Sequence, residues 1–309
     1  MQTPLTSSGF TIGVCAADSS PHLPSLLNFL LREDFGDSAP LRRLIVVASG
    51  CSNNILASAR RISNSDARVL LIEEPSRKGK AEAINRILEN SEGENLVFVN
   101  ADAMPEPGSV RKLIEMAAED ETVGCVSACP VFEKKPGLLH DSLGLMWSAH
   151  NLLSLRLNHA GISNHSSDEL LLVKRSFLSR LPTNLVNDGA YIGGLAKSRG
   201  LRVRFCEGAK VRIVVPGRVN ELIAQRRRIL FGHIQVWRKL GSPPQTMESL
   251  IIRRPLFSAR FLVSVLAERP KSILTLLVVA TTEIASTILA MVDWATSSDQ
   301  HTVWRRFER

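Results

Sequence analysis

Asn95-Leu-Val-Phe-Val-Asn-Ala-Asp-Ala-Met-Pro-Glu-Pro-Gly108 is the stretch of this chain that decides the fold. The apolar run from Leu96 to Val99 predicts a fully buried strand, and two prolines that follow Asp102 stop any regular structure. Asn100 and Asp102 therefore lie at a strand tip, where open α/β sheets bind their ligands. A carboxylate there can hold Mg²⁺ or Mn²⁺ together with substrate phosphates, so Asp102 is our candidate metal ligand. The alternative is that Asp102 only caps the following helix.

Apolar runs and helical patterns alternate on both sides of this stretch. Three strands are expected before it, at Phe10–Ala16, Leu44–Ala48 and Arg68–Ile72, with a polar turn at Asp18–Pro21 after the first. Strands that alternate with helices at this spacing indicate βαβ units and a mainly parallel sheet. Later strands are expected at Val123–Val131, Asp168–Val173, Leu201–Phe205 and Val211–Val215, and later helices at Ser109–Ala118, Leu138–Leu157, Asn187–Ser198 and Arg218–Leu240.

Length and composition limit the possible classes of protein. A chain of 309 residues suits one large α/β domain, expected over residues 1–240, with a helical appendage over residues 241–309. A net charge of +8 favours anionic partners such as nucleotide phosphates, nucleic acid or an acidic membrane surface. Five cysteines without a paired motif indicate a reducing compartment. Met1–Gly9 shows no secretory signal, so we expect a cytoplasmic protein.

A basic loop precedes the helix expected at Ala81–Leu88. Arg77, Lys78 and Lys80 surround Gly79 at the start of this helix, where backbone N–H groups already favour an anion. The loop suits a diphosphate, although a solvated basic turn would have the same composition. It is not a Walker loop, because the glycine spacing and the Lys-Ser/Thr ending are missing.

Two later segments carry further charged candidates. Asp188 stands where a helix opens, and it could be a functional acid or only an N-cap. Arg226, Arg227 and Arg228 follow Gln225 in the long basic helix. Three consecutive arginines cover nearly a whole helical turn, so at least one should face inward or toward a ligand.

The C-terminal part differs in character from the rest of the chain. Ser249–Ala267 mixes large apolar residues with arginines and contains no acid, which suits a helix lying on an anionic bilayer surface. Ser272–Val292 is long enough to span a membrane, but its threonines, its serines and Glu283 make it polar for such a segment. An interfacial helix or an oligomer-forming helix is the alternative.

Four of these features stand in an order that resembles the family 2 inverting glycosyltransferases of the GT-A fold, especially their membrane-associated branch. The resemblance runs from about Phe10 to His233. It rests on an Asp-x-Asp-like strand tip, an Arg-x-Gly-Lys-x-x-Ala-x-Asn loop, an acid that opens a helix, and a Gln-x-x-Arg helix. The fold it implies is a Rossmann-like, mainly parallel sheet flanked by helices.

The resemblance implies roles for particular residues. Asp102 would hold the metal and Asp188 would be the catalytic base. Ile229 stands where many relatives have the tryptophan that ends the Gln-x-x-Arg-Trp motif. The residues expected to bind the donor are Ala17, Ser49, Arg77, Lys80, Asn85, Asn100, Asp102, Gln225 and Arg228.

The implied function is metal-dependent transfer, with inversion, of one sugar from a UDP- or GDP-sugar to a lipid-linked or small hydroxyl acceptor. The expected place is the cytoplasmic face of the membrane, with a homo-oligomer possible and no nucleic acid bound. A sugar-phosphate nucleotidyltransferase is one alternative, but the turn after the first strand lacks the glycines and lysine typical of it. A non-catalytic nucleic-acid-binding protein is the other, and the single tyrosine offers little base stacking.

Overall fold

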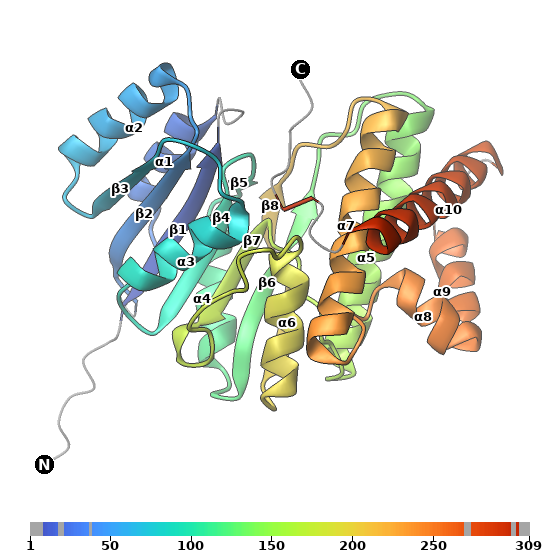
Figure 1. Ribbon diagram of the computed structural model, residues 1–309. Helices are drawn as coiled ribbons and strands as arrows, with labels where there is room; N and C mark the ends of the chain where they lie inside the picture. The colour runs from blue at the N-terminus through green and yellow to red at the C-terminus, as the bar shows by residue number, and fades with distance from the viewer. Residues whose placement is uncertain (1–8, 18–21, 37–38, 269–272, 298–300, 303–309) are drawn as a thin grey trace, which may run out of the picture.

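The structure is a computed structural model that describes residues 9–17, 22–36, 39–268, 273–297 and 301–302 (Figure 1). The predicted turn at Asp18–Pro21 and residues 1–8 of the N-terminal stretch lie outside the described residues. Figure 1 shows one sheet with helices on both faces and, on the right, a group of long helices beside it. The α/β architecture predicted from the sequence is confirmed.

The strands are β1 (Phe10–Ala17), β2 (Leu41–Ser49), β3 (Val69–Glu74), β4 (Asn95–Asn100), β5 (Met104–Pro105), β6 (Val123–Val131), β7 (Leu170–Lys174) and β8 (Arg202–Arg212). They form one sheet in the order β3-β2-β1-β4-β7-β6-β8-β5. β1 to β4 pair in parallel, whereas β7 is antiparallel to both β4 and β6. Because β7 runs against its neighbours, its first residues lie at the edge where β1, β2 and β4 end.

The helices are α1 (Leu23–Arg32), α2 (Asn53–Ser65), α3 (Lys80–Asn90), α4 (Ser109–Ala118), α5 (Leu138–His159), α6 (Asp188–Ser198), α7 (Val219–Leu240), α8 (Met247–Arg253), α9 (Pro255–Glu268) and α10 (Ile273–Thr296). Two apolar cores lie on the two faces of the sheet. Val97 and Val99 of β4 belong to the core that includes α1, and Leu96 and Phe98 belong to the core that includes α3. A strand covered on both faces must be apolar at every position, which explains the uninterrupted run in the sequence.

The two strands expected at Leu201–Phe205 and Val211–Val215 are one strand, β8. Its pairing with β6 shifts register after Cys206, so that Glu207, Gly208 and Ala209 form a bulge where the sequence suggested a break. β8 is not the last strand of the sheet, because the two-residue strand β5 pairs with its outer side.

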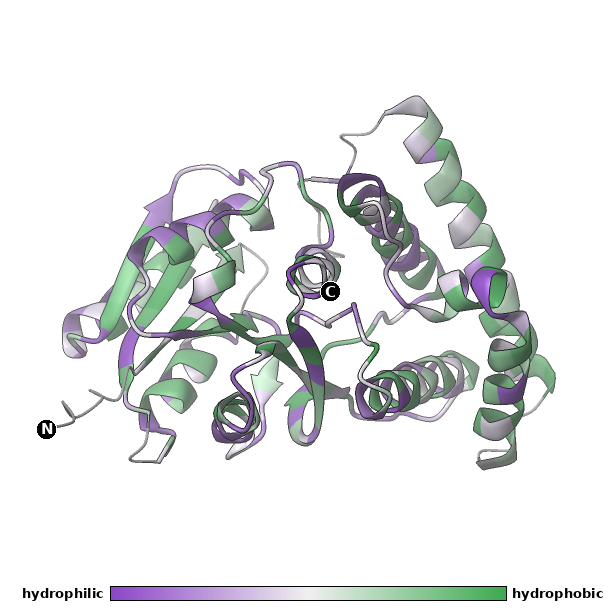
Figure 2. Ribbon diagram, turned by 90° about the horizontal axis from the view of Figure 1, so that it is seen from below, coloured by the Kyte–Doolittle hydropathy of each residue, from purple (hydrophilic) through white to green (hydrophobic). Residues whose placement is uncertain are grey.

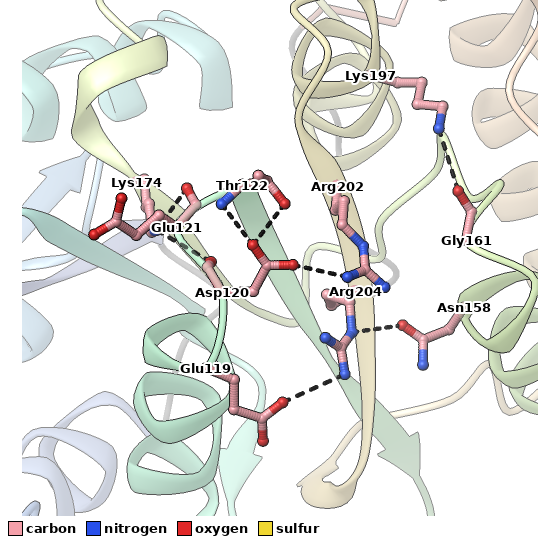
Figure 3. A network of polar contacts seen from close by, with 10 residues as sticks. All are labelled: Glu119, Asp120, Glu121, Thr122, Asn158, Gly161, Lys174, Lys197, Arg202 and Arg204. Atoms are coloured by element: carbon pink, nitrogen blue, oxygen red, sulfur yellow. Dashed lines mark hydrogen bonds and ion pairs between the residues drawn. The ribbon is translucent and has the colours of Figure 1, made fainter.

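The arginines at the start of β8 have structural partners at the end of the sheet opposite the strand tips (Figure 3). Arg202 donates to Asp120 at 2.7 Å, and Asp120 also accepts from the backbone and side chain of Thr122. Arg204 donates to Asn158 of α5 at 3.1 Å. These exposed or half-buried contacts join β8 to the turn before β6 and to α5, so these two arginines belong to the scaffold.

The C-terminal helices are joined to α7 through partly buried ion pairs. Arg226 pairs with Glu248 of α8 and, at 2.8 Å, with Glu283 of α10. Arg227 donates to Asp293 of α10 at 2.5 Å. The prediction that an arginine of this run faces inward is therefore confirmed. The single helix expected over Ser249–Ala267 is two helices, because a proline opens α9 and helices usually end before such a residue.

Three imidazole rings fill the space between α5 and α7. His165 lies between His150 of α5 and His233 of α7, with ring centroids 6.1 and 5.4 Å away. Burial lowers the pKa of His150 and His165 to about 3 and that of His233 to about 4. All three rings are thus neutral at pH 7 and pack as aromatic groups.

Within the described residues, α10 is the one helix long and apolar enough to cross a membrane, and 22% of its most apolar part is buried. Three of its polar side chains, those of Thr282, Ser286 and Asp293, are buried against the other helices. Many of its large apolar side chains are exposed, and Ile284 and Ile288 are examples. Figure 2, coloured by hydropathy, shows many hydrophobic residues, in green, along the C-terminal helices.

Asn85, which its motif predicted to bind the donor, forms hydrogen bonds within the protein. It is buried in α3, and its amide accepts a hydrogen bond from the Leu181 N–H at 2.7 Å and donates one to the Leu181 carbonyl at 3.0 Å. Both ends of the amide therefore hold the loop between β7 and α6 against α3.

We expect the substitution Asn85→Ala to lower the free energy of unfolding by about 1–3 kcal/mol, because it leaves both backbone groups of Leu181 buried without a partner. Urea denaturation measures this change. Asn54→Ala, on the exposed face of α2, is the control and should change stability by less than about 0.5 kcal/mol. An Asn85→Ala protein of unchanged stability with weakened nucleotide binding would instead support the donor-binding role.

Candidate active site

Charged side chains from five separate segments meet where the parallel strands end. The segments are the start of α3, the turn after β4, the residues before β7, the start of α6 and the middle of α7. These side chains lie close enough for their charges to shift one another's pKa values. The group comprises Lys80, Asp102, Asp168, Glu169, Asp188 and Arg228. We name it the strand-tip cluster.

Lys80 is the centre of this cluster. Its ammonium group pairs with the carboxylate of Asp168 and lies 3.0 Å from Oδ2 of Asp188. Burial alone would lower the pKa of Lys80, but the two carboxylates outweigh burial and raise it. For Asp168, burial is likewise outweighed, since Lys80 and Arg228 hold its pKa at about 2. These two groups are therefore charged at neutral pH.

Asp188 is not the cap of its helix. Asn187 is the N-cap of α6, and its side-chain oxygen accepts a hydrogen bond from the Ala190 N–H at 3.0 Å. The Asp188 side chain is therefore free of capping and points toward Lys80. Burial raises the pKa of Asp188 above its ordinary value, and the nearby charge of Asp168 adds to this effect. A carboxylate with a raised pKa is suited to proton transfer near neutral pH.

The approach of Asp168 to Asp188 depends on a glycine. A Cβ atom at Gly189 would lie 2.6 Å from the carbonyl oxygen of Ser166 and 3.0 Å from Cβ of Asp168. The Ser166 hydroxyl also donates to the Gly189 carbonyl at 2.7 Å. The missing side chain thus lets the segment before β7 pack directly on the first turn of α6.

Asp102 follows β4 as predicted, and it is not a helix cap. The N-cap of α4 is Gly108, whose N–H donates to Glu33 at 2.5 Å. The alternative reading of Asp102 is therefore wrong. Asn100, at the end of β4, lies beside Glu169, because its backbone N–H donates to the Glu169 carbonyl at 3.1 Å.

The residues at this tip suit a divalent metal ion. Burial, together with the charges of Asp168 and Asp102, raises the pKa of Glu169 to about 8. Among the residues that the structure describes, the buried Oε2 atom of Glu169 has no hydrogen-bond partner. Carboxylate oxygens are the ligands that Mg²⁺ and Mn²⁺ prefer. Within the described ranges, no group of three or more acids, histidines or cysteines forms a complete metal cage.

Arg228, the arginine of the Gln-x-x-Arg motif, extends from α7 into the strand-tip cluster. Burial lowers its pKa, and the charges of Asp168, Asp188 and Asp102 oppose this effect. Gln225 lies three residues earlier, on the same face of the helix. Ile229 occupies the next position along α7.

The predicted donor-binding residues of the first strands lie at the same edge. Ala17 ends β1, and Ser49 ends β2, where its hydroxyl donates to Glu74 at the end of β3. Arg77 packs across Gly50, where a Cβ atom would lie 2.9 Å from Cγ of the arginine.

The described C-terminal residues lie against this edge of the molecule. A Cβ atom at Gly79, which has φ of +101°, would lie 2.9 Å from the carbonyl oxygen of Thr302. Figure 1 shows this short segment between the sheet and α7. The basic loop thus contacts the last described residues of the chain.

Asp168 and Glu169 were not predicted as site residues. Two consecutive acids before an apolar run were a visible signal, but the sequence does not show that β7 is antiparallel. Only that direction places its first residues beside the tip of β4. Cys15 of β1 also lies near the cluster, and burial raises its pKa to about 12, so its thiol is protonated and unreactive.

Comparisons with known proteins agree with this architecture. A mannosyltransferase, PcManGT from Pyrobaculum calidifontis in complex with GDP-Man and Mn²⁺, is 22% identical, with a TM-score of 0.68 over 93% of this chain and 87% of that chain. The glucosyl-3-phosphoglycerate synthase of Mycobacterium tuberculosis, in complex with Mg²⁺ and UDP, is 18% identical, with a TM-score of 0.52 over 77% and 81%. These likenesses show the fold. No curated protein matches the chain in sequence.

The family model described as "Glycosyltransferase like family 2" matches residues 8–232, which include the whole strand-tip cluster. This match favours a glycosyltransferase over the nucleotidyltransferase and nucleic-acid-binding alternatives. The chain belongs to the family 2-like glycosyltransferases and has their GT-A fold.

Proposed function

We propose that this enzyme transfers one sugar, with inversion, from a UDP- or GDP-sugar to a lipid-linked or small hydroxyl acceptor, with Mg²⁺ or Mn²⁺ at Asp102. The observation that carries this proposal is the convergence of Lys80, Asp102, Asp188 and Arg228 at the carboxyl end of the sheet. The two similar structures, solved with GDP-Man and Mn²⁺ or with UDP and Mg²⁺, support it. Residues 1–240 would form the catalytic part and residues 241–309 the attachment part.

The donor carries two phosphates, which need positive charge around them. Lys80 and Arg228 would bind phosphate oxygens from α3 and α7, and Arg77 would approach from the basic loop. The metal ion, held by Asp102, would neutralise the charge that develops on the departing nucleoside diphosphate. Asn100 would contact the nucleoside side of the donor.

Asp188 would act as the base. The acceptor hydroxyl gives its proton to the Asp188 carboxylate while its oxygen attacks the anomeric carbon of the sugar. The bond from that carbon to the diphosphate oxygen breaks on the opposite face, and the diphosphate leaves with the electron pair. Attack opposite the leaving group inverts the configuration at the anomeric carbon.

Asp188→Asn should keep the affinity for nucleoside diphosphate and lower the transfer rate by about 10²-fold or more, the contribution of a positioned base. Steady-state kinetics and calorimetry measure the two quantities. Asp141→Asn is the matched control, because Asp141 also lies in the first turn of a helix and pairs with a lysine, Lys134, at 2.7 Å. Near-normal turnover in Asp188→Asn would assign the base to another group.

The product should carry one added sugar or very few. Ile229 replaces the aromatic platform on which processive relatives stack a sugar ring, and one helix of the described residues could cross a membrane. We expect incubation with a panel of UDP- and GDP-sugars, lipid-linked acceptors and Mn²⁺ to add the mass of a single sugar in the mass spectrum. Removal of the metal with EDTA should abolish this product. A ladder of long chains would contradict the proposal.

The C-terminal helices would attach the enzyme to the cytoplasmic face of a membrane. Every large apolar side chain that is strongly exposed within the described residues belongs to α7, α8, α9 or α10. Ile252 of α8 and Leu256 of α9 are 80% and 78% exposed, and Arg253 and Arg254 lie between them. An apolar surface that carries cations fits the headgroup region of an anionic bilayer.

Flotation with liposomes tests this attachment. The protein should float with anionic liposomes and less with neutral ones, and Arg253→Glu with Arg254→Glu should reduce flotation, since each cation near the surface contributes about 1 kcal/mol. The matched control is Arg60→Glu with Arg61→Glu, a neighbouring arginine pair on α2 at the other end of the molecule (Figure 1). Absence from both liposome fractions would favour a homo-oligomer that buries α10.

A further inference from the structure

We propose that Glu169, the residue just before β7, is a second carboxylate ligand of the divalent metal ion beside Asp102. This inference rests on the proposed function, because it concerns the metal ion that Asp102 would hold. It assigns a new residue to the site, one that none of the sequence motifs contains.

The pairing of β4 with β7 places Glu169 at the metal strand. Val99 is opposite Leu170, and the Asn100 N–H donates to the Glu169 carbonyl at 3.1 Å, so the antiparallel register continues to this pair. Residues directly opposite in antiparallel strands project from the same face of a sheet. The Glu169 side chain therefore starts on the same face as Asn100, two residues before Asp102.

The Glu169 carboxylate forms no ion pair with any residue that the structure describes. Its Oε2 atom is buried and unpaired within the described part of the chain. The nearby ammonium group of Lys80 is already shared by Asp168 and Asp188. The other charges that act strongly on Glu169 are the negative ones of Asp168 and Asp102. A buried carboxylate among like charges is costly unless a cation accompanies it.

The charge of the strand-tip cluster matches a divalent ion. Among the described residues, it contains four carboxylates (Asp102, Asp168, Glu169 and Asp188) and two cations (Lys80 and Arg228). With every group ionised, these six side chains have an excess of two negative charges. One Mg²⁺ or Mn²⁺ ion neutralises this excess.

The number of ligands also fits. Mg²⁺ in phosphate-transfer sites is usually held by one or two carboxylates, with water and substrate phosphates completing the shell. Asp102 and Glu169 would be the two carboxylates, and the donor diphosphate would complete the site. Glu169 would thus bring the number of anionic protein ligands to two.

Calorimetry with GDP and with UDP, each with and without Mn²⁺, tests the assignment without any need for the acceptor. In the wild-type protein Mn²⁺ should strengthen nucleotide binding. Glu169→Gln keeps the shape of the side chain and should reduce the Mn²⁺-dependent gain by at least about ten-fold, the lower limit for losing a residue that supports a metal ligand. Glu169→Asp keeps the charge and should retain part of the gain.

Two further variants separate the possible results. Asp102→Ala should lose the Mn²⁺-dependent gain, and Glu119→Gln, at the opposite end of the sheet, should keep it. If Asp102→Ala loses the gain while Glu169→Gln binds as the wild type does, the proposed metal site stands and the role of Glu169 is overturned. If the wild-type protein gains nothing from Mn²⁺, the proposed function and this inference both fail.

Thermal unfolding without metal distinguishes a metal ligand from a structural group. The charged neighbours of Glu169 are two carboxylates, Asp168 and Asp102, and Lys80, which already pairs with other acids. Without metal, the Glu169→Gln variant should therefore be at least as stable as the wild type. The addition of Mn²⁺ with GDP should then raise the unfolding temperature of the wild type more than that of the variant. A variant that is much less stable without metal would show that the carboxylate has a structural partner and would overturn the inference.

Discussion

The position of Lys80 between two carboxylates is the interaction on which the site depends. Asp168 comes from the segment before β7 and Asp188 from the first turn of α6, so one ammonium group joins three distant parts of the chain. Two acids this close would repel each other without a cation. The same lysine therefore makes it possible to bring a candidate base and the basic loop to one edge of the sheet.

Helix α7 connects this site to the C-terminal helices. Its three consecutive arginines point in different directions because successive residues of a helix are about 100° apart. Arg226 holds α8 and α10, Arg227 holds α10, and Arg228 extends into the strand-tip cluster. A helix that holds one of the cations of this cluster and also anchors a proposed membrane surface would keep the proposed active site close to lipid.

The apolar face of α10 points away from the protein, whereas a surface helix of a water-soluble protein turns its apolar face toward the core. Polar side chains such as Thr282 and Ser286 are buried against the other helices, whereas apolar ones such as Ile284 and Ile288 face outward. Burial of hydroxyls costs little here because they bond to helix carbonyls, as Ser286 does with Ile223. The outward face has a cost in water, which a lipid surface would remove.

The sequence alone determined the parallel half of the sheet, the strand tip at Asp102, the basic loop and the inward arginine of α7. These features follow from local periodicity and from the residue types at strand ends, which nearby residues specify. Only the tertiary structure decided that β7 is antiparallel, that Asp168 and Glu169 lie at the site, and that Asn85 holds the loop at Leu181. Strand direction and the partner of a buried amide depend on segments about 70 to 100 residues away, as the bonds of Asn100 to Glu169 and of Asn85 to Leu181 illustrate. No local pattern in the chain records such distant contacts, since the same apolar run can pair in either direction.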